Sequence, residues 1–448
     1  MKVNVLVAEI GSTTTVVNAF DLKNSEFIGQ GQGPTTVLDG DVTIGLNMAL
    51  DDLKKNIGVN NIEYDDFLAT SSAAGGLRMT VHGLVFDMTA RAAREAALGA
   101  GAIIKLVTAG KLRRSDLNKI KEIKPNIILV AGGLDYGERD TAIYNAEEIA
   151  KLKLDVPVIY AGNIENHEDV KLIFEEYEQK LYIVENVYPR IDELNVEPTR
   201  RVIQSVFEEH ITGAPGMQKV RQMVNGPIIP TPGAVMECAI LLQREIGDLM
   251  VLDVGGATTD VHSVTQGSDE IQRIMISPEP FAKRTVEGDL GVYVNLPHIV
   301  ERIGLENVKK KFWNAEELIN NRKPIPKTER EIEFVEFMTQ EAVLTAVRRH
   351  VGSIRYIYGP SGKKTIAEGK DLTNVKWIIG TGGALTRLPN RVNIMKKIPQ
   401  DNTGGMFLYP KDSVEILVDN CYIMASLGVL SKKYEEAALK ILKKSLGI

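Results

Sequence analysis

The feature that most constrains the fold of this chain is a strand–turn–strand signature that occurs twice. The first copy reads Glu9-Ile-Gly-Ser-Thr-Thr-Thr15 and the second Asp253-Val-Gly-Gly-Ala-Thr-Thr259, at an offset of 244 residues. In each copy a β-rich run ends at an acidic residue, a glycine follows two positions later, and a second β-rich run leaves the turn. A repeat separated by half a chain predicts two homologous lobes, each opening on an antiparallel hairpin.

The length and charge of the chain set broad limits. Its 448 residues are enough for two to four domains of roughly 100–200 residues each. The formal net charge of −6 gives no general attraction to nucleic acid or anionic lipid. The start, MKVNVLVAEIG, has no long apolar segment or cleavage site, and no run approaches the length of a membrane span. We therefore expect a soluble, cytoplasmic protein without nucleic-acid or membrane partners.

The segment between the two copies has a different hydrophobic pattern. Apolar runs at 126–131, 156–160 and 181–187 alternate with helical patterns at 139–151 and 167–178. This alternation is typical of a parallel sheet with both faces covered by helices. The sequence therefore predicts an α/β protein in which a parallel α/β layer is inserted in or after the first lobe.

Domain boundaries and the C-terminal elements follow from the same patterns. We expect the first lobe at 1–105, the inserted domain at 106–195 and the second lobe at 196–448. Near the end of the chain, the pattern predicts a last strand at 406–408, followed by a long helix over 413–430.

The residue types in the two turns are those that phosphate binding requires. Glycine lets the backbone approach a phosphate, turn N–H groups and hydroxyls donate to its oxygens, and a nearby carboxylate holds Mg²⁺ through water. One such turn is weak evidence, because the glycine also satisfies hairpin geometry, but two in register favour nucleotide binding. The predicted phosphate ligands are Gly11, Ser12, Thr13, Thr14, Gly255, Gly256, Thr258 and Thr259, and the predicted metal ligands are Glu9 and Asp253.

A third segment fits the other end of a nucleotide. Lys376-Trp-Ile-Ile-Gly-Thr-Gly-Gly-Ala-Leu385 reads as a strand that runs into a glycine doublet at the start of a helix. A backbone without side chains would let an adenine and its ribose lie flat there. Alone, this is an ordinary strand-to-helix turn; after the second phosphate turn it predicts adenosine binding by Gly380, Gly382, Gly383 and Ala384.

Together, the three segments resemble the phosphate-1, phosphate-2 and adenosine motifs of the actin, sugar kinase and Hsp70 superfamily. That resemblance implies two ribonuclease-H-like lobes that clamp Mg-ATP, with the parallel α/β layer as an insertion. It also implies crossed connecting helices, for which 232–239 and 420–428 are the candidates because their small residues allow close approach.

Within that superfamily, the whole chain resembles the MutL/GlmL accessory family of adenosylcobalamin-dependent glutamate mutase. Segments 69–78, 129–135 and 283–291 are similar to internal signatures of the family. The resemblance implies an ATP-dependent chaperone, with ATP and Mg²⁺ as cofactors and the subunits of a B12-dependent mutase as partners. Such a chaperone reactivates its mutase by releasing damaged cobalamin, as the diol dehydratase reactivating factors do.

One residue departs from the superfamily pattern, which usually has Asp at the position of Glu9. The extra methylene displaces the carboxylate by about 1.5 Å, one carbon–carbon bond. Because phosphoryl transfer depends on the placement of charge, we expect nucleotide binding to survive and hydrolysis to be slow or altered.

Other polar residues have two interpretations each. Asp260 ends the second phosphate motif, or it accepts a hydrogen bond that stabilises the lobe. His262 has no metal-ligand spacing and reads as structural. Glu287 or Asp289 could orient an attacking water, although Asp289 also suits helix capping; the predicted catalytic residues are Glu9, Asp253 and Glu287. The Gly132-Gly133 doublet follows a parallel strand, where such sheets bind ligands, but it serves equally as a simple turn.

Three other functions remain open. A small-molecule kinase of the same fold would need an acceptor motif that the sequence does not show. The activator of 2-hydroxyacyl-CoA dehydratase has a very similar Gly-Ser-Thr-Thr-Thr turn, but it uses two cysteines per chain for an iron–sulfur cluster; Cys238 and Cys421 lie in apolar surroundings and read as buried thiols. A nucleotide-gated scaffold with little hydrolysis follows if Glu9 is disabling.

Overall fold

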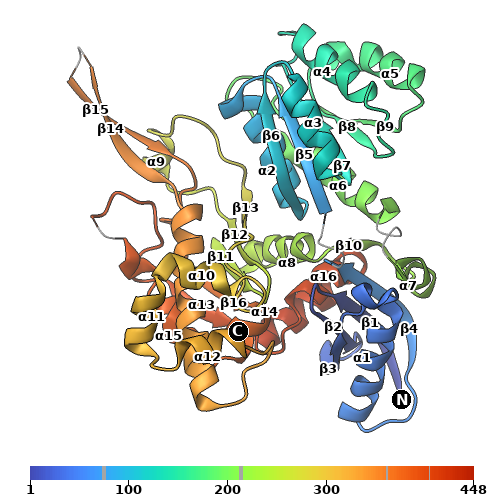
Figure 1. Ribbon diagram of the computed structural model, residues 1–448, viewed down its shortest axis with the longest axis vertical. Coiled ribbons are helices and arrows are strands. Elements are labelled where there is room, and N and C mark those ends of the chain that lie inside the picture. The colour runs from blue at the N-terminus through green and yellow to red at the C-terminus, as the bar shows by residue number, and fades with distance from the viewer. Residues whose placement is uncertain (73–76, 211–214, 360–361, 403) are drawn as a thin grey trace. The chain divides into compact units, whose positions relative to one another are not determined.

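The computed structural model describes residues 1–72, 77–210, 215–359, 362–402 and 404–448. They form two compact units, Met1–Val235 and Met236–Ile448 (Figure 1). Each unit contains a five-stranded sheet of mixed direction, and the first unit contains a second sheet whose five strands are all parallel. Within the described residues, no helix has both the length and the apolarity needed to cross a membrane.

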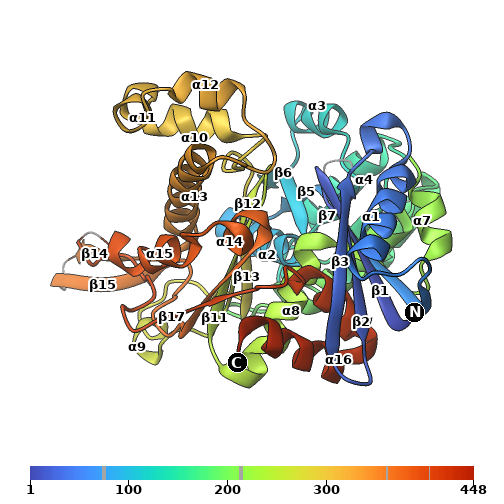
Figure 2. The ribbon, with the colours of Figure 1, turned by 90° about the horizontal axis from the view of Figure 1, so that it is seen from below.

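The first lobe is built on a sheet with the order β10-β4-β1-β2-β3. Its strands are β1 (Lys2–Ile10), β2 (Thr14–Asp21), β3 (Glu26–Pro34), β4 (Glu63–Ser71) and β10 (Ile228–Pro230). The first three form an antiparallel meander, and β4 and β10 continue the sheet in parallel with β1. Helix α1 (Val42–Asn56) starts where the Asp41 carboxylate accepts the N–H of Thr43, and it packs on β2 and β3 (Figure 2).

The second lobe repeats this topology, with the order β17-β16-β11-β12-β13. Its strands are β11 (Leu249–Val254), β12 (Thr259–Val264), β13 (Ala282–Glu287), β16 (Trp377–Thr381) and β17 (Glu415–Val418). The register is repeated as well: β1 and β2 pair Val5 with Phe20, and β11 and β12 pair Leu249 with Val264, at the same offset of 244 residues. The prediction of two homologous ribonuclease-H-like lobes, each opening on a hairpin, is confirmed.

The inserted sheet has the order β6-β5-β7-β8-β9. Its strands are β5 (Leu77–Gly83), β6 (Ala102–Ala109), β7 (Ile127–Val130), β8 (Val158–Tyr160) and β9 (Leu181–Ile183), and its helices are α2 (Arg91–Gly99), α3 (Arg114–Ile123), α4 (Asp140–Ala150) and α5 (His167–Glu176). All neighbouring strands run parallel, so the predicted parallel α/β layer is confirmed. Its central strands are fully buried, which explains their continuous apolar runs.

The sheets divide the chain differently from the expected boundaries at 105/106 and 195/196. The sequence patterns did not indicate β5 and β6, which belong to the inserted sheet, so the insertion begins near residue 77. After the insertion the chain returns to the first lobe through α6 (Val196–His210), α7 (Met217–Met223) and β10. Residues 73–76, within the resemblance at 69–78, lie outside the described residues.

The second unit also contains the remaining α-helices of the chain that the structure describes. They are α9 (Asp269–Gln272), α10 (Leu296–Ile303), α11 (Leu305–Lys311), α12 (Ala315–Asn320), α13 (Glu329–His350), α14 (Gly382–Arg387), α15 (Arg391–Lys396) and α16 (Met424–Leu446), and α8 (Thr231–Ile246) spans the boundary between the units. A two-stranded ribbon, β14 (Ser353–Gly359) and β15 (Gly362–Glu368), follows α13. The α16 segment is two helices joined at a non-helical residue, Tyr434.

The expected strand at 406–408 and helix at 413–430 are wrong. The last strand is β17, and the helical segment begins only at Met424. The run Glu415–Val418 pairs in parallel with β16, so sheet pairing overrides the helical spacing there.

Candidate functional site

The two predicted phosphate turns have the same backbone geometry. In the first, the N–H of Gly11 donates to the carbonyl of Thr14 at 3.0 Å; in the second, the N–H of Gly255 donates to the carbonyl of Thr258 at 2.9 Å. Both donor and acceptor are related by the offset that relates the sequence motifs. Thr14 and Thr259 are the first residues of the strands that leave the turns.

The second turn is held in place by the segment that follows β13. The N–H of Val292 donates to the carbonyl of Gly255 at 3.2 Å, and the N–H of Tyr293 donates to that of Gly256 at 2.9 Å. The Asn295 side chain donates to the carbonyl of Ala257 at 2.7 Å. The carbonyls of the turn are therefore occupied by the protein itself, which fixes the turn before any ligand arrives.

The N–H groups of the second turn are in a different situation. Among the described residues, none accepts a hydrogen bond from the N–H of Gly256, Ala257 or Thr258. Consecutive N–H groups without internal acceptors in a tight turn form a concave site for an anion. The Thr258 hydroxyl donates to Asp260 at 3.3 Å, and the buried Thr259 hydroxyl donates to the carbonyl of Leu290 at 2.7 Å. Thr259 therefore contributes to the lobe interior.

Asp253, at the end of β11, stands in an unusually acidic setting. Burial and the nearby carboxylates of Asp260 and Asp419 raise its pKa to about 7, while Arg284 acts in the opposite direction. Its side chain nevertheless retains some exposure to solvent. A divalent cation would stabilise the ionised form of such a partly exposed carboxylate, because it would offset the excess negative charge around it.

The predicted adenosine segment lies at the same edge of the sheet, because β16 runs parallel to β11 and pairs Thr381 with Asp253. Gly382 has a φ of +78°, and a Cβ at this position would lie 2.4 Å from Oδ1 of Asp253. Gly383 has nothing within 4 Å of its Cβ position, which leaves open space beside α14. A Cβ on Gly380 would instead meet Met395, so Gly380 faces the protein interior. Ala384 is largely buried in α14.

The first-lobe turn is set among hydroxyl groups. Glu9, at the end of β1, is 6% exposed and pairs in register with Val16 on one side and Thr70 on the other. The Thr70 hydroxyl accepts a hydrogen bond from Thr231 at 3.2 Å. In the turn itself, the Ser12 hydroxyl donates to the carbonyl of Ser72 at 3.3 Å. Thr13 completes the turn, and its carbonyl accepts the N–H of Thr35 at 3.0 Å.

The acidic residues after β13 are held by one arginine from α13. The Arg349 guanidinium donates to Glu287 and also reaches Asp289 at 2.7 and 2.8 Å. Burial raises the pKa of Glu287, whereas the Arg349 hydrogen bond lowers the pKa of Asp289. Arg349 contacts one oxygen of Glu287, Oε2, and so positions this side chain.

Asp260 stabilises the lobe. Its Oδ1 accepts hydrogen bonds from Nε and Nη2 of Arg284 at 3.1 and 2.7 Å, and both side chains are almost fully buried. His262 is buried beside this pair, its pKa is held well below the usual range by burial, and neither ring nitrogen has a hydrogen-bond partner among the described residues. The structural interpretation of both residues agrees with this geometry.

Sequence patterns missed Arg284, Arg349 and Asp419. Asp419 directly follows β17 and accepts the Thr381 hydroxyl at 3.0 Å, the Ser445 hydroxyl at 2.8 Å and two N–H groups at the start of α16. It therefore connects the adenosine strand to both ends of the α16 segment. An acidic residue directly after the apolar run 416–418 was the sequence signal for it.

The donor set fits magnesium bound to a nucleotide better than a protein-enclosed metal. Among the described residues there is no cluster of three or more carboxylate, histidine or cysteine side chains that could hold a metal. Mg²⁺ usually keeps several waters and takes one or two protein carboxylates together with phosphate oxygens. Asp253 meets that requirement in the second lobe, and Glu9 is the corresponding carboxylate of the first.

The glycine doublet after β7 and the cysteine in α8 both lie in surroundings that indicate a structural role. Gly132 and Gly133 lie in the loop after β7, where the Asp135 carboxylate accepts the N–H of Ile164 at 3.0 Å and the Asn186 amide at 2.9 Å. This network ties neighbouring loops together, which agrees with the turn interpretation. Cys238 is buried in α8, and burial, with a smaller effect of Asp419, raises its pKa well above the usual range.

Comparison with known proteins gives one family and one relative. The family described as MutL protein matches residues 5–446. A curated protein from Clostridium tetanomorphum, "Protein MutL", is 37% identical over 461 aligned residues that cover 98% of each chain.

Solved structures show weaker likenesses. Nucleotide-free acetone carboxylase has a TM-score of 0.43 at 12% identity, covering 96% of this chain and 70% of that one. Nucleotide-free diol dehydratase-reactivating factor has a TM-score of 0.37 at 11% identity, and the match covers 96% of this chain and 100% of that one. Component A of (R)-2-hydroxyglutaryl-CoA dehydratase from Acidaminococcus fermentans has a TM-score of 0.31 at 10% identity, and the match covers 97% of this chain and 98% of that one. At these scores the likenesses add nothing to the fold described above.

Proposed function

The chain belongs to the MutL protein family, and from that premise we propose that it is an ATP-dependent chaperone for a coenzyme-B12-dependent mutase. Its client would be glutamate mutase or a related aminomutase, and its task the release of damaged cobalamin. A large cofactor enclosed between subunits leaves only if their interface opens, and ATP binding and hydrolysis would supply the free energy for that step.

One observation carries the nucleotide part of this proposal. The second turn presents the N–H groups of Gly256, Ala257 and Thr258 without internal acceptors, next to the partly exposed carboxylate of Asp253. Anion donors and a cation ligand side by side suit a magnesium-bound polyphosphate. The repeated geometry of the Gly11 turn supports a second set of phosphate contacts from the first lobe.

The residues then have distinct tasks. Asp253 and Glu9 would hold Mg²⁺ through its waters, and the cation would neutralise charge on the phosphates during their cleavage. The turn N–H groups would orient the phosphates, and the open space at Gly383 would accept the adenosine. Gly382 would keep the adenosine strand in contact with Asp253, so that both ends of the nucleotide are held by one edge of the sheet.

Two measurements test this proposal separately. Titration with a fluorescent ATP analogue, with and without Mg²⁺, tests nucleotide binding by the purified chain. A B12 mutase inactivated with hydroxocobalamin, incubated with the chain and MgATP, tests reactivation. Recovery of activity that requires both supports the chaperone; binding of MgATP with no recovery for glutamate, ornithine or lysine mutases would overturn the chaperone role alone. Substrate-dependent ADP formation with sugars, polyols or acids would instead indicate a kinase.

A nucleotide-gated scaffold with little hydrolysis is the second candidate, and the Arg349 contact favours it. Arg349 pairs with both Glu287 and Asp289, so its guanidinium competes with an attacking water for these carboxylates. The expected ATPase is therefore weak. Reactivation by a non-hydrolysable ATP analogue would identify the scaffold, whereas a strict need for hydrolysis would identify the ATPase.

A further inference from the structure

The inserted domain is electrically polarised along its sheet. Residues 105–124 contain seven basic and two acidic side chains, and residues 165–185 contain seven acidic and two basic ones. The first stretch comprises most of β6 and all of α3, and the second comprises α5 and β9. Since the strand order is β6-β5-β7-β8-β9, the two stretches lie at opposite edges of one sheet.

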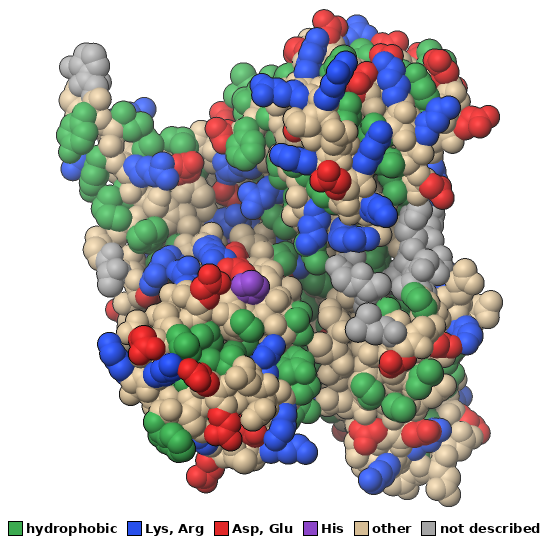
Figure 3. Space-filling view, in the orientation of Figure 1, with side chains coloured by type: hydrophobic (Ala, Val, Ile, Leu, Met, Phe, Trp, Pro, Cys, Tyr) green, Lys and Arg blue, Asp and Glu red, His purple; other side chains and the backbone are tan. Residues whose placement is uncertain are grey.

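The basic edge carries uncompensated charge. Lys105 on β6 and Arg114, Lys119 and Lys121 on α3 are exposed. None of the seven cations of this stretch forms an ion pair with any residue that the structure describes. Figure 3 shows basic side chains gathered on this part of the inserted domain. Elsewhere in the chain many exposed cations have carboxylate partners, so this edge presents a positive potential toward solvent.

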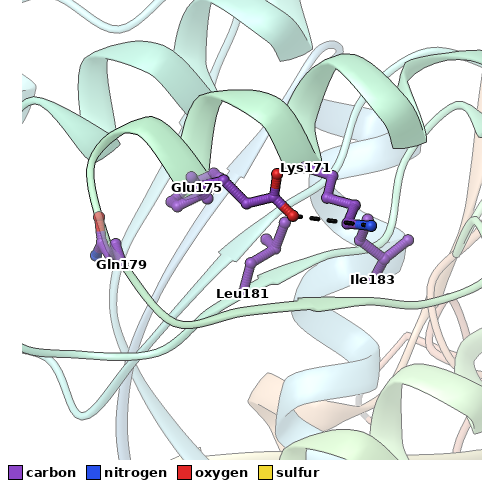
Figure 4. A pocket seen from close by; sticks show the side chains of 6 residues that line it. Lys171, Glu175, Gln179, Leu181 and Ile183 are labelled. Atoms are coloured by element: carbon purple, nitrogen blue, oxygen red, sulfur yellow. Dashed lines mark ion pairs between the residues drawn. The ribbon is translucent and has the colours of Figure 1, made fainter.

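The acidic edge contains an apolar groove. It lies between α5 and β9, has a volume of about 280 Å³, and is lined by Phe174, Leu181 and Ile183 with Lys171, Glu175 and Gln179 (Figure 4). Lys171 and Glu175 form an ion pair at 3.7 Å. The neighbouring Leu172 is 59% exposed and Ile183 is 37% exposed. Apolar side chains within an acidic rim present a surface that a basic partner would cover.

The outermost strand at each edge of the inserted sheet could also pair with a strand of another molecule. On their outer sides, β6 and β9 have no neighbour among the described strands. Proteins commonly protect such edges by charges of one sign, which repel a second copy. Here the two edges have opposite signs, so the charges of one copy attract the other edge of the next.

From this arrangement we propose that copies of this chain associate head to tail, with the basic β6–α3 edge of one copy against the acidic α5–β9 groove of another. The interface is heterologous, since different surfaces of the two copies meet, and it continues into a ring or an open chain. A nucleic acid is the less suitable occupant of the basic edge, because residues 77–195 together carry sixteen basic and nineteen acidic side chains and electrostatic repulsion from the acidic edge opposes a polyanion.

Sedimentation velocity of the full chain tests the proposal. At about 50 mM salt we expect the weight-average mass to rise with protein concentration to at least twice the 49.3 kDa of the monomer, and to return to the monomer at about 500 mM salt, where charges are screened. The variant K119E/K121E lowers the net charge of residues 105–124 from +5 to +1, and E175K/E176K changes that of residues 165–185 from −5 to −1, so each variant removes most of the attraction. Each alone should stay monomeric, and an equimolar mixture of the two should associate again.

A matched control reverses the exposed lysines Lys310 and Lys327 of the second lobe, and K310E/K327E should associate like the natural protein. Circular dichroism and thermal unfolding of every variant check that the fold is intact. Three results would overturn the proposal: a natural protein that stays monomeric at low salt, association that survives either edge reversal, or a mixture of reversed variants that stays monomeric. Binding of a DNA or RNA oligonucleotide that K119E/K121E abolishes, without self-association, would assign the basic edge to nucleic acid instead.

Discussion

The two opening hairpins share the same backbone arrangement but differ in the side chains around their turns. Their strands pair in the same register, and their turns close with the same hydrogen bond at the same offset. The residue opposite the terminal acid is Val16 in the first lobe and Asp260 in the second. Two residues further along these strands, the first lobe has Asn18 and the second has the buried His262.

This difference indicates how the repeated lobes diverged. The second lobe gathers Asp253, Asp260, Asp419 and Arg284 around its turn, whereas the first sets Glu9 beside Val16 and the hydroxyl of Thr70. Both lobes have a turn closed by the same hydrogen bond, but the larger cluster of charged groups surrounds the second turn. The lobes are therefore not interchangeable, and substitutions at equivalent positions should have unequal effects.

The largest effect is expected at Asp253. Replacing Asp253 by Ala removes the carboxylate proposed to hold Mg²⁺ and should lower kcat for ATP hydrolysis by about 1,000-fold or more, which corresponds to about 4 kcal/mol. Phosphate release measures the loss, and Asp253→Asn, which keeps the side-chain size, is the matched control for packing. The equivalent Glu9→Ala should cost less; equal losses would contradict the asymmetry of the lobes, and an unchanged kcat in Asp253→Ala would refute its assignment.

The buried ion pair gives the next largest effect, on stability. Arg284→Leu leaves the Asp260 carboxylate buried without its partner and should destabilise the protein by about 3 kcal/mol. The first lobe has Val16 at the position equivalent to Asp260. The double variant Asp260→Val/Arg284→Leu should therefore lose less stability than either single variant. Urea unfolding measures all three, and additive losses would show that the pair does not act as a unit.

Gly382 tests the contact between the adenosine segment and the phosphate turn. Gly382→Ala places a Cβ against Asp253 and a side chain in the left-handed region, which should cost about 2 kcal/mol of stability and reduce ATP turnover. Gly383→Ala, at a position with open space, is the control and should change stability by less than about 0.5 kcal/mol. Similar losses in the two variants would disprove the special role of Gly382.

Exchanging the two acidic residues sharpens the comparison further. Glu9→Asp gives the first lobe the shorter carboxylate side chain that Asp253 has in the second, and it should raise ATP turnover by up to about tenfold if carboxylate placement limits hydrolysis. Asp253→Glu should lower turnover instead. Both retain the charge, so a change in nucleotide affinity without a change in kcat would show that placement does not limit hydrolysis.

The smallest expected effect is a pH dependence of stability. The pKa of His262 is lower in the folded state than the unfolded value of about 6.5, so its stabilising contribution is present above pH 6.5 and is lost as the pH falls below it. His262→Leu should reduce the loss of stability between about pH 7 and pH 5.5 by about 1 kcal/mol. Unfolding in urea at both pH values measures this. The equivalent Asn18 does not titrate, and Asn18→Leu should leave the pH dependence unchanged.

Local pattern was sufficient to predict the repeated hairpins and the layer between them. A β-rich run, a terminal acid and a glycine turn are encoded within a few consecutive residues, so the two antiparallel hairpins could be predicted from the sequence, whereas their register is seen only in the structure. The inserted domain was predicted in class but not in extent, because β5 lies between β6 and β7 in the sheet, and no short window shows which strands become neighbours.

The sequence by itself determined where the backbone can be approached closely, since such approach depends on glycine at particular positions. Only the tertiary structure decided which charges surround them. Arg284 reaches Asp260 across β12 and β13, Asp419 reaches Thr381 through the pairing of β17 with β16, and Arg349 captures Glu287 from α13. These contacts join residues 24 to 62 positions apart. Their identity depends on sheet order and helix packing, which exist only once the chain has folded.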